Sequence, residues 1–397
     1  MSISPYSLLN SHSFGSNNWC FKFQPLDKAN GLLLSLSNGE IHCLDFGTCQ
    51  SKQSIRVSNL SINDLKILNS DFHCGSLFST ATAESVKIFD INSNNGPIAT
   101  LHNDKNVPFL SLDSRHGLLA MGTELQGVDA QINIYDIRKW DTPLRSLIDS
   151  HHDDVTALKF HPSDPTVLLS GSTDGYTNVY DLTQQDEDDA LHQVMNYASI
   201  HSCGWLSPNR IFTLSHMETF AIHELNDKSE ELKEPQPLDF GDVREKWGCD
   251  YVIDVYPGYI AAGKSQEGNG QLKLIPTNGE NISVKDSVVI PSAHGDEVIR
   301  DVFIPPSHSE LVYSCGEDGF VNLWKNNNGA LNVPEQFWDY SKRTMHVLDG
   351  DFSLESGNEV EKSKLGVEKR EKSKKSKSKK SKKKEKKHSK SQRFKPY

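Results

Sequence analysis

The sequence has no long apolar run and no paired cysteines. Nowhere do about 18 apolar residues follow one another, which is the length that a transmembrane helix needs. Residues 1–16 have neither the cationic start nor the apolar stretch of a secretory signal. The seven cysteines are scattered, with no CxxC pair and no histidine at zinc spacing. These absences argue against a membrane span and favour reduced, buried thiols in a cytosolic or nuclear protein.

Catalytic motifs are also scarce. No GxSxG stretch occurs. Residues 258–265, GYIAAGKS, fit the GxxxxGK[ST] pattern of a phosphate-binding loop, but that loop needs a strand before it and a helix after it. Here residues 259–262 themselves have the pattern of a strand, and Gly268 and Gly270 break any helix that follows. We therefore expect no enzymatic activity, no catalytic residue, no metal site and no cofactor.

Charge is distributed unevenly along the chain. Residues 361–397 hold 18 Lys or Arg against 4 Glu, so this segment carries +14 and residues 1–360 carry −25. From residue 349 onward aromatic and apolar residues almost vanish, and such a segment cannot bury enough surface to offset its ordering entropy. The sequence therefore predicts a folded acidic body over residues 1–345 and a disordered Lys/Ser-rich tail over residues 346–397.

The sequence predicts three short strands between His151 and Leu182. Residues 155–161 alternate apolar and polar side chains, residues 167–171 are apolar, and the turn Thr173-Asp174-Gly175 leads into a third strand. Strands of this length suit a small antiparallel sheet that cannot bury both of its faces alone. The same layout recurs over residues 298–325, so several such sheets are expected to pack side by side.

Four side chains recur at fixed spacing in these two segments. A histidine stands four residues before the valine that opens the first strand, a serine stands four residues before the turn aspartate, and an aromatic residue stands six residues after it. Buried polar groups need partners, so the spacing predicts a hydrogen-bond chain that pins the turn to the sheet. The two sets are His151, Ser170, Asp174 and Tyr180, and His294, Ser314, Asp318 and Trp324.

These sets resemble the structural tetrads of WD-repeat propeller blades. Seven third strands end near residues 43, 88, 134, 179, 222, 274 and 323, with steps of 43 to 52 residues. A period near 45 is that of a four-stranded propeller blade. The predicted fold is an all-β, seven-bladed WD-repeat β-propeller with blades at about residues 16–46, 62–91, 107–137, 155–182, 200–225, 250–277 and 298–325.

Two segments are candidates to close the ring. In WD-repeat proteins an N-terminal strand commonly completes the last blade, and residues 3–11 have the pattern to do so. Residues 337–340, FWDY, are the alternative. We favour the N-terminal strand; either choice hides sheet edges that would otherwise promote aggregation.

The acidic insertions leave two interpretations open. Residues 184–189, QQDEDD, follow the fourth blade, and residues 226–245 form a long linker rich in glutamate. Either segment is a solvated charged loop or an acidic contact surface for a partner.

A narrower resemblance is to the WD repeat-containing protein 89 family, over about residues 15–326. It is carried by HHDDVTALKFHPSDPTVLLSGSTDGYTNVYDL with the later DEDDAL, by SIHSCGW from Ser199, by GDVR from Gly241, and by CGEDG from Cys315. This resemblance implies a nuclear propeller. The lysine-dense tail departs from the family pattern.

One short motif points to a specific partner. Tyr135, Asp136 and Arg138 are similar to the Trp-Asp-x-Arg box with which some WD-repeat proteins dock the adaptor of cullin-RING ubiquitin ligases, with tyrosine in place of tryptophan. The structural alternative is that Asp136 caps its strand and forms a surface ion pair with Arg138.

The tail predicts a compartment and a second class of partner. A KKSKKKEKK-type run suits nuclear import, and its cations could contact phosphates by counterion release; the lysines are Lys374, Lys375, Lys379, Lys380, Lys382, Lys383, Lys384, Lys386 and Lys387. We expect a nuclear or nucleolar protein, with some in the cytoplasm, that acts as a monomer within a larger complex. Its expected partners are proteins on the propeller faces and RNA, DNA or preribosomal particles on the tail, with no membrane partner.

Overall fold

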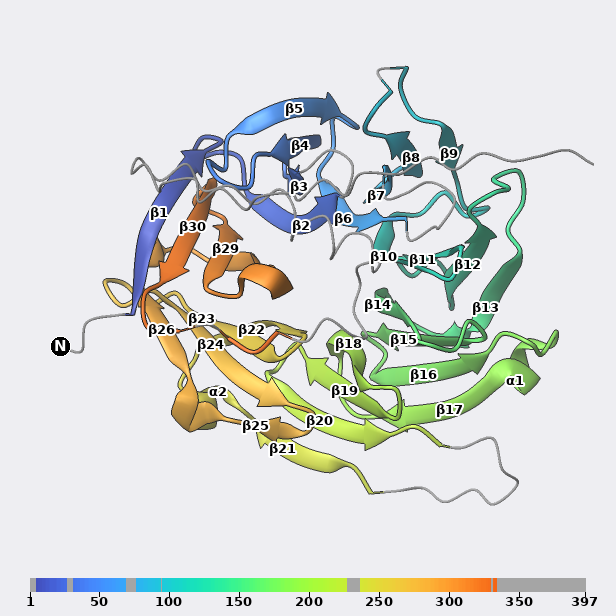
Figure 1. Cartoon of the computed structure of the whole chain (residues 1–397). Coiled ribbons are helices and arrows are strands. Elements are labelled where there is room, and N and C mark those ends of the chain that lie inside the picture. Colours follow the sequence, from blue (N-terminus) through green and yellow to red (C-terminus); the bar gives the residue numbers. More distant parts are fainter. Residues whose placement is uncertain are drawn as a thin grey trace, which may run out of the picture. The chain divides into compact units, whose positions relative to one another are not determined.

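In the part of the chain that the structure describes, nearly all of the β-strands belong to seven separate sheets around a common axis. The computed structural model describes residues 5–26, 31–68, 76–93, 95–226, 236–329 and 331–333. Figure 1 shows the sheets side by side as the blades of a propeller, each running outward from the centre. The predicted all-β, seven-bladed architecture is therefore confirmed.

Blades 1 to 4 follow one another along the chain, each with its strands ordered from the centre outward. Blade 1 holds β2 (Cys20–Leu26), β3 (Gly31–Leu36), β4 (Glu40–Leu44) and β5 (Ser51–Arg56). Blade 2 holds β6 (Ile62–Ile67), β7 (Leu77–Thr82), β8 (Val86–Asp90) and β9 (Ala99–Leu101). Blade 3 holds β10 (Phe109–Arg115), β11 (Leu118–Thr123), β12 (Ala130–Asp136) and β13 (Arg145–His151). Blade 4 holds β14 (Val155–Phe160), β15 (Val167–Ser172), β16 (Tyr176–Asp181) and β17 (Leu191–Asn196).

Blades 5 to 7 complete the ring. Blade 5 holds β18 (Ile200–Ser207), β19 (Arg210–Ser215), β20 (Thr219–Glu224) and β21 (Leu238–Asp242). Blade 6 holds β22 (Tyr251–Tyr256), β23 (Tyr259–Lys264) and β24 (Gln271–Asn278), with β25 (Asn281–Ile282) and β26 (Val288–Pro291) both paired to β24. Blade 7 holds β28 (Ile299–Phe303), β29 (Leu311–Gly316), β30 (Phe320–Asn326) and β1 (Tyr6–Ser13), and it is preceded by β27 (Ala293–Asp296).

The helices of the described part of the chain are short. They are α1 (Glu187–Ala190), α2 (Arg244–Trp247) and the 3-10 turns η1 (Val284–Asp286) and η2 (Pro306–His308). None of them has the length and apolar character needed to cross a membrane.

The core is divided among the joints between blades. Each second strand is flanked by two strands in its own sheet and by a blade on either side, so every residue of β3, β15 and β29 is buried. Among the described residues, buried apolar side chains form seven clusters, and each cluster combines residues of two neighbouring blades. A single blade therefore has no complete core of its own.

The N-terminal strand closes the ring, as predicted. β1 pairs antiparallel with β30, from Tyr6 opposite Asn326 to Ser13 opposite Phe320. Figure 1 shows β1 as the outer strand beside β30. Residues 337–340, the alternative closing segment, lie outside the described residues.

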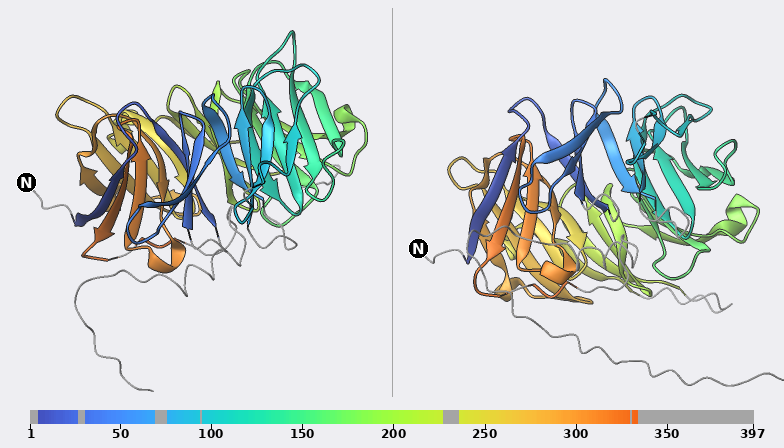
Figure 2. Two further views of the ribbon diagram at one scale, coloured as in Figure 1. Left: turned by 90° about the horizontal axis from the view of Figure 1, so that it is seen from above. Right: turned by 45° about the horizontal axis from the view of Figure 1, so that its top comes forward.

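The strand order gives the ring two distinct faces. Turns from second to third strands, and connections from one blade to the next, form one face, which we call the tetrad face because it carries His151, Asp174, His294 and Asp318. Turns from first to second and from third to fourth strands form the opposite face. Figure 2 shows the strands running between these two faces.

Candidate functional site

The predicted side chains of blade 4 meet in the interior. His151 is 1% exposed; its Nδ1 lies 2.9 Å from Asp174 Oδ2 and its Nε2 lies 2.6 Å from Ser170 Oγ. Ser170 Oγ is 3.3 Å from the Tyr180 hydroxyl. Asp174 also accepts the N–H groups of His152 and Tyr176, so the chain ties the turn to the end of β13.

Blade 7 repeats this chain with tryptophan in place of tyrosine. His294 Nδ1 lies 2.9 Å from Asp318 Oδ1, and its Nε2 lies 2.7 Å from Ser314 Oγ. Trp324 Nε1 donates to the same Ser314 oxygen at 3.0 Å. Because all four groups are satisfied internally, the geometry supports a structural role for both tetrads rather than a catalytic one.

Polar contacts that the sequence analysis missed join the innermost strands of neighbouring blades. Three first-strand aspartates each accept a backbone N–H from the next blade at 2.7 Å. The pairs are Asp301 with Phe23, Asp64 with Leu112, and Asp113 with Phe160. The N–H groups of these strands face the centre of the ring, where no further strand can pair with them, so the carboxylates satisfy them.

The remaining joints are bridged by other side chains. Thr156 Oγ1 donates to the Ile200 carbonyl at 2.6 Å, Ser202 Oγ donates to Asp254 at 2.7 Å, and the Tyr256 hydroxyl donates to Asp301 at 2.5 Å. Lys22 pairs with Asp64 across the joint of blades 1 and 2. Together these groups form a polar collar around the central channel. The signal in the sequence is the presence of charged residues among the apolar residues of the first strands, as in INDLKI and VIDVYP.

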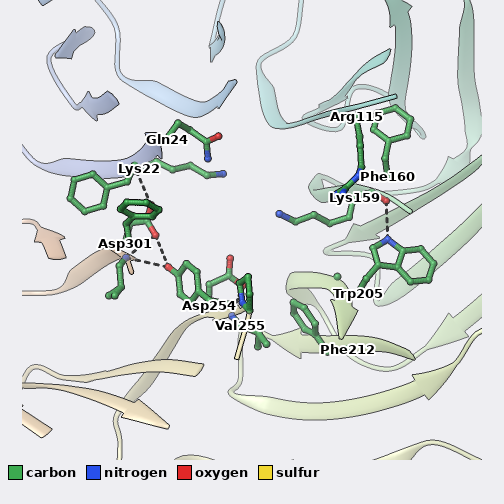
Figure 3. Close-up of a pocket in the computed structure, with 16 residues that line it drawn as sticks. Lys22, Gln24, Arg115, Lys159, Phe160, Trp205, Phe212, Asp254, Val255 and Asp301 are labelled. Carbon is green, nitrogen blue, oxygen red and sulfur yellow. Dashed lines mark hydrogen bonds between the residues drawn. The ribbon is translucent and has the colours of Figure 1, made fainter. Parts of the chain in front are cut away.

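A deeply buried ion pair belongs to this collar. Lys66 Nζ lies 2.7 Å from Asp113 Oδ1, and the two side chains are 2% and 4% exposed. Close to it, a cavity of about 90 Å³ lies inside the ring between blades 1, 3, 4, 5, 6 and 7. Figure 3 shows Lys22 and Lys159 reaching into this cavity from opposite sides, with Asp254 and Asp301 below Lys22.

Asp301 should make stability depend on pH. Burial raises the pKa of its carboxyl from 3.8 to about 6. The folded protein then holds a proton that the unfolded chain releases near pH 4, so this group's contribution to stability is lost as the pH rises from about 4 to about 6. We expect the loss to be about 3 kcal/mol.

Asp301→Asn tests this expectation. The difference in free energy of unfolding between wild type and variant should change by about that amount between pH 4 and pH 7, measured by urea denaturation. A difference that stays constant over this range would contradict the raised pKa.

A larger cavity opens on the tetrad face, at the mouth of the channel. Every first strand is interrupted near its start by a bulge, where one residue has no partner in the second strand. The bulged residue is the second of the strand in six blades and the third, Ile253, in blade 6. The bulged side chains converge on one cavity of about 550 Å³. They are Phe21, Asn63, Leu110, Thr156, His201, Ile253 and Arg300.

The rim of this cavity, which we call the channel mouth, is preorganised on one side. Trp19 is 44% exposed, Arg300 Cζ lies 6.0 Å from its ring centroid, and Arg300 also pairs with Glu317. Phe21 packs edge-on against Trp19 with centroids 6.2 Å apart. The mouth thus combines exposed aromatic surface with a fixed cation, a combination typical of protein-binding hot spots.

The phosphate-loop pattern belongs to a strand, as predicted. Residues 259–264 form β23, the second strand of blade 6. A Cβ on Gly263 would lie 2.1 Å from Tyr251 Cζ, so this glycine makes room for an aromatic ring.

The described cysteines are free and buried: Cys20, Cys43, Cys49, Cys203, Cys249 and Cys315. Burial raises the pKa of Cys203 to about 12, which leaves its thiol protonated and unreactive near neutral pH. No group of three metal-binding side chains occurs in the part of the chain that the structure describes.

The acidic loop after blade 4 makes internal contacts. Glu187 accepts the backbone N–H groups of Ile148 and Asp149 at 2.8 and 3.0 Å, on the outer edge of β13. Arg145 donates to the carbonyl of Asp186 at 3.1 Å. This loop is therefore neither freely solvated nor wholly available to a partner, because Glu187 caps the edge of blade 3. Residues 227–235 of the second acidic insertion lie outside the described residues.

The predicted adaptor motif lies on the opposite face, at the end of β12. Arg138 is 64% exposed and its Nε donates to Asp136 Oδ1 at 2.8 Å. The hydrogen bond from Arg138 lowers the pKa of Asp136 to about 2. Tyr135 is buried beside Trp140 and does not share this surface. Asp242 and Arg244 form the same pair on the tetrad face, so the geometry is a local turn motif that occurs on both faces.

The nine predicted tail lysines, Lys374 to Lys387, lie outside the described residues.

Comparisons with known proteins agree with this geometry. A family model described as "WD domain, G-beta repeat" matches residues 141–181 and 286–325, the segments that contain the two tetrads. A WD repeat-containing protein of Saccharomyces cerevisiae is 66% identical over 349 residues, which cover 88% of this chain and 89% of the relative. The chain belongs to the WD-repeat family.

Two further similarities fit the WD-repeat family. A WD repeat-containing protein 89 homolog of Dictyostelium discoideum is 31% identical over 289 residues, covering 69% of this chain and 74% of the relative, in agreement with the resemblance found from the sequence. The β-propeller domain of Cps50 (Swd1) from Myceliophteria thermophila superposes with a TM-score of 0.60 at 16% identity, over 81% of this chain and 99% of that domain. This second similarity concerns the WD-repeat fold alone.

Proposed function

We propose that this WD-repeat protein is a non-enzymatic nuclear scaffold that binds other proteins at the channel mouth. The observation that carries the proposal is the convergence of seven bulged side chains on one cavity of about 550 Å³, beside the exposed ring of Trp19. The polar collar below the mouth holds this surface rigid, so the propeller loses little conformational entropy when a partner binds.

The lysine-rich tail supports the rest of the proposal. A +14 segment attached to a −25 body suits nuclear or nucleolar import and weak, salt-dependent contact with RNA, DNA or preribosomal particles. We propose that the tail directs the chain to the nucleus, while the propeller selects its protein partners.

A capture experiment tests both parts. The intact chain, a form truncated before Glu361, and a Trp19→Ala/Arg300→Ala variant are used to capture nuclear proteins at low and high salt. We expect the mouth variant to lose protein partners that the intact and truncated chains retain, and the truncated form to lose nucleic acid and nuclear import. Val194→Ser on the outer strand β17 is the control. Equal protein capture by the mouth variant and by this control would contradict the proposal.

The alternative function is that of a substrate receptor for a cullin-RING ubiquitin ligase. It is favoured by the exposure of Arg138 on the opposite face, where an adaptor could bind without obstructing the mouth. Purified adaptor should then bind the wild type and lose affinity for Arg138→Ala, but not for Arg244→Ala, which breaks the equivalent pair on the tetrad face. Adaptor binding that is absent, or that is equal in both variants, would exclude this function.

A further inference from the structure

Two turns on the tetrad face are longer than the others. Six residues separate Thr123, the end of β11, from Ala130, the start of β12, and six separate Lys264 from Gln271 in blade 6. The corresponding turn has three residues in the other five blades. We call residues 124–129 the blade 3 turn.

The blade 3 turn is anchored from both sides. From the connection that precedes the blade, Lys105 Nζ donates to the carbonyls of Gln126 and Asp129 at 3.1 and 2.9 Å. From the connection that follows the blade, Asp154 accepts the Leu125 N–H at 2.8 Å, and His152 Nδ1 lies 2.9 Å from Asp129 Oδ1. These contacts fix the conformation of the turn before any partner arrives.

An apolar side chain lies near the tip of this anchored turn. Val128 is 74% exposed, more than any other large apolar side chain in the described ranges. The blade 6 turn has the same length but the sequence SQEGNG, with no apolar side chain. The length of the turn therefore does not by itself explain why an apolar side chain is exposed at residue 128. An exposed apolar group on a rigid turn gains free energy when a partner covers it, at little cost in loop ordering.

The charges around Val128 indicate the partner. Asp104 and Glu124 are exposed, and Asp153 and Asp154 stand beside His152. The nearby cations, Lys105 and His152, are both engaged by the turn itself. The surface available to a partner is therefore apolar at its centre and acidic around it, which is complementary to an apolar group flanked by lysine or arginine.

We propose that the blade 3 turn docks a basic amphipathic segment of a partner protein. An aliphatic side chain of that segment packs against Val128, and its cations face Asp104 and Glu124. The inference rests on the proposed function of the WD-repeat protein as a scaffold. It adds a second contact on the tetrad face, outside the channel mouth, and names the chemistry of the partner.

The test uses a labelled, helix-length peptide of leucine and lysine in amphipathic order, titrated with the full chain and followed by fluorescence anisotropy. Val128→Ser should weaken binding about tenfold, because the substitution removes the apolar side chain that the bound peptide would cover. Glu124→Gln should weaken it about threefold. The matched control Val194→Ser, at a valine that is 49% exposed on β17, should leave the affinity within about twofold. Unchanged thermal unfolding will show that each variant folds.

Further peptides separate specific docking from general attraction. A leucine and glutamate peptide should not bind, and a lysine and serine peptide should bind much more weakly than the leucine and lysine peptide. Equal binding of the lysine and serine peptide, or an unchanged affinity in Val128→Ser, would overturn the inference.

Trp19→Ala distinguishes this inference from the proposed function. It should leave the peptide affinity unchanged, because the channel mouth is a separate contact. A Trp19→Ala/Arg300→Ala variant that keeps all its protein partners would reject the mouth but not the blade 3 turn. If the peptide does not bind while protein capture still depends on the channel mouth, only the docking role of the blade 3 turn is rejected.

Discussion

Replacing Asp113 with alanine is expected to destabilise the folded protein by about 3–5 kcal/mol. The change removes the carboxylate that faces the buried Lys66 ammonium at 2.7 Å, and it also removes the acceptor of the Phe160 N–H. A buried charge that loses its counter-ion is costly because the surrounding interior solvates it poorly. Urea denaturation followed by tryptophan fluorescence should show a lower midpoint at an unchanged m-value.

Two controls separate charge burial from other effects. Lys66→Met combined with Asp113→Asn leaves no buried charge and keeps an acceptor for Phe160, so it should recover most of the lost stability. Glu40→Gln breaks the partly exposed pair with Arg56 and should cost at most about 1 kcal/mol. A loss below about 1 kcal/mol in Asp113→Ala itself would mean that the collar does not hold the blades together.

Deleting residues 1–13 is expected to abolish cooperative folding of the ring. The deletion removes β1, leaves one edge of β30 without its partner, and takes Tyr6 out of the cluster at the joint of blades 6 and 7. An unpaired strand edge invites pairing with other chains, so the truncated protein should aggregate. Size-exclusion chromatography and thermal unfolding will measure both effects.

A synthetic peptide of residues 1–13 provides the decisive control. Added in trans, it should pair with β30 by strand addition and restore cooperative unfolding in a concentration-dependent way. Leu8→Ser in the full chain keeps the backbone pairing and alters a half-exposed side chain, so its melting temperature should change little. A monomeric truncated chain that unfolds like the wild type would show that β1 is dispensable for closure.

Features with a local signal could be predicted from the sequence. The tetrads of blades 4 and 7 were located because a histidine, a serine, an aspartate and an aromatic residue keep the same spacing in both, and the structure brings each set within hydrogen-bonding distance. The degenerate blades were placed only by their period. The outer strands were not predicted, because their sequences lack a clear strand pattern. Some of them are polar, such as β5 with the sequence SKQSIR, and others are very short, such as β9.

The channel mouth and the role of the acidic loop could not be predicted in this way. The bulged residues lie about 45 positions apart and share no chemistry, so only closure of the ring brings Phe21, His201 and Arg300 to one cavity. In the sequence, Glu187 likewise has only the pattern of a solvated acidic loop. Its contacts with the edge of β13 are visible only in the tertiary structure.

The sequence by itself determined the repeat. Alternating strands, tight turns and the period near 45 require small sheets that must share their cores, and the composition separates an acidic body from a basic tail. Only the tertiary structure decided how those sheets are joined. Aspartates, lysines and hydroxyl groups bridge the joints, because backbone donors around a central channel can be satisfied only by side chains from a neighbouring blade.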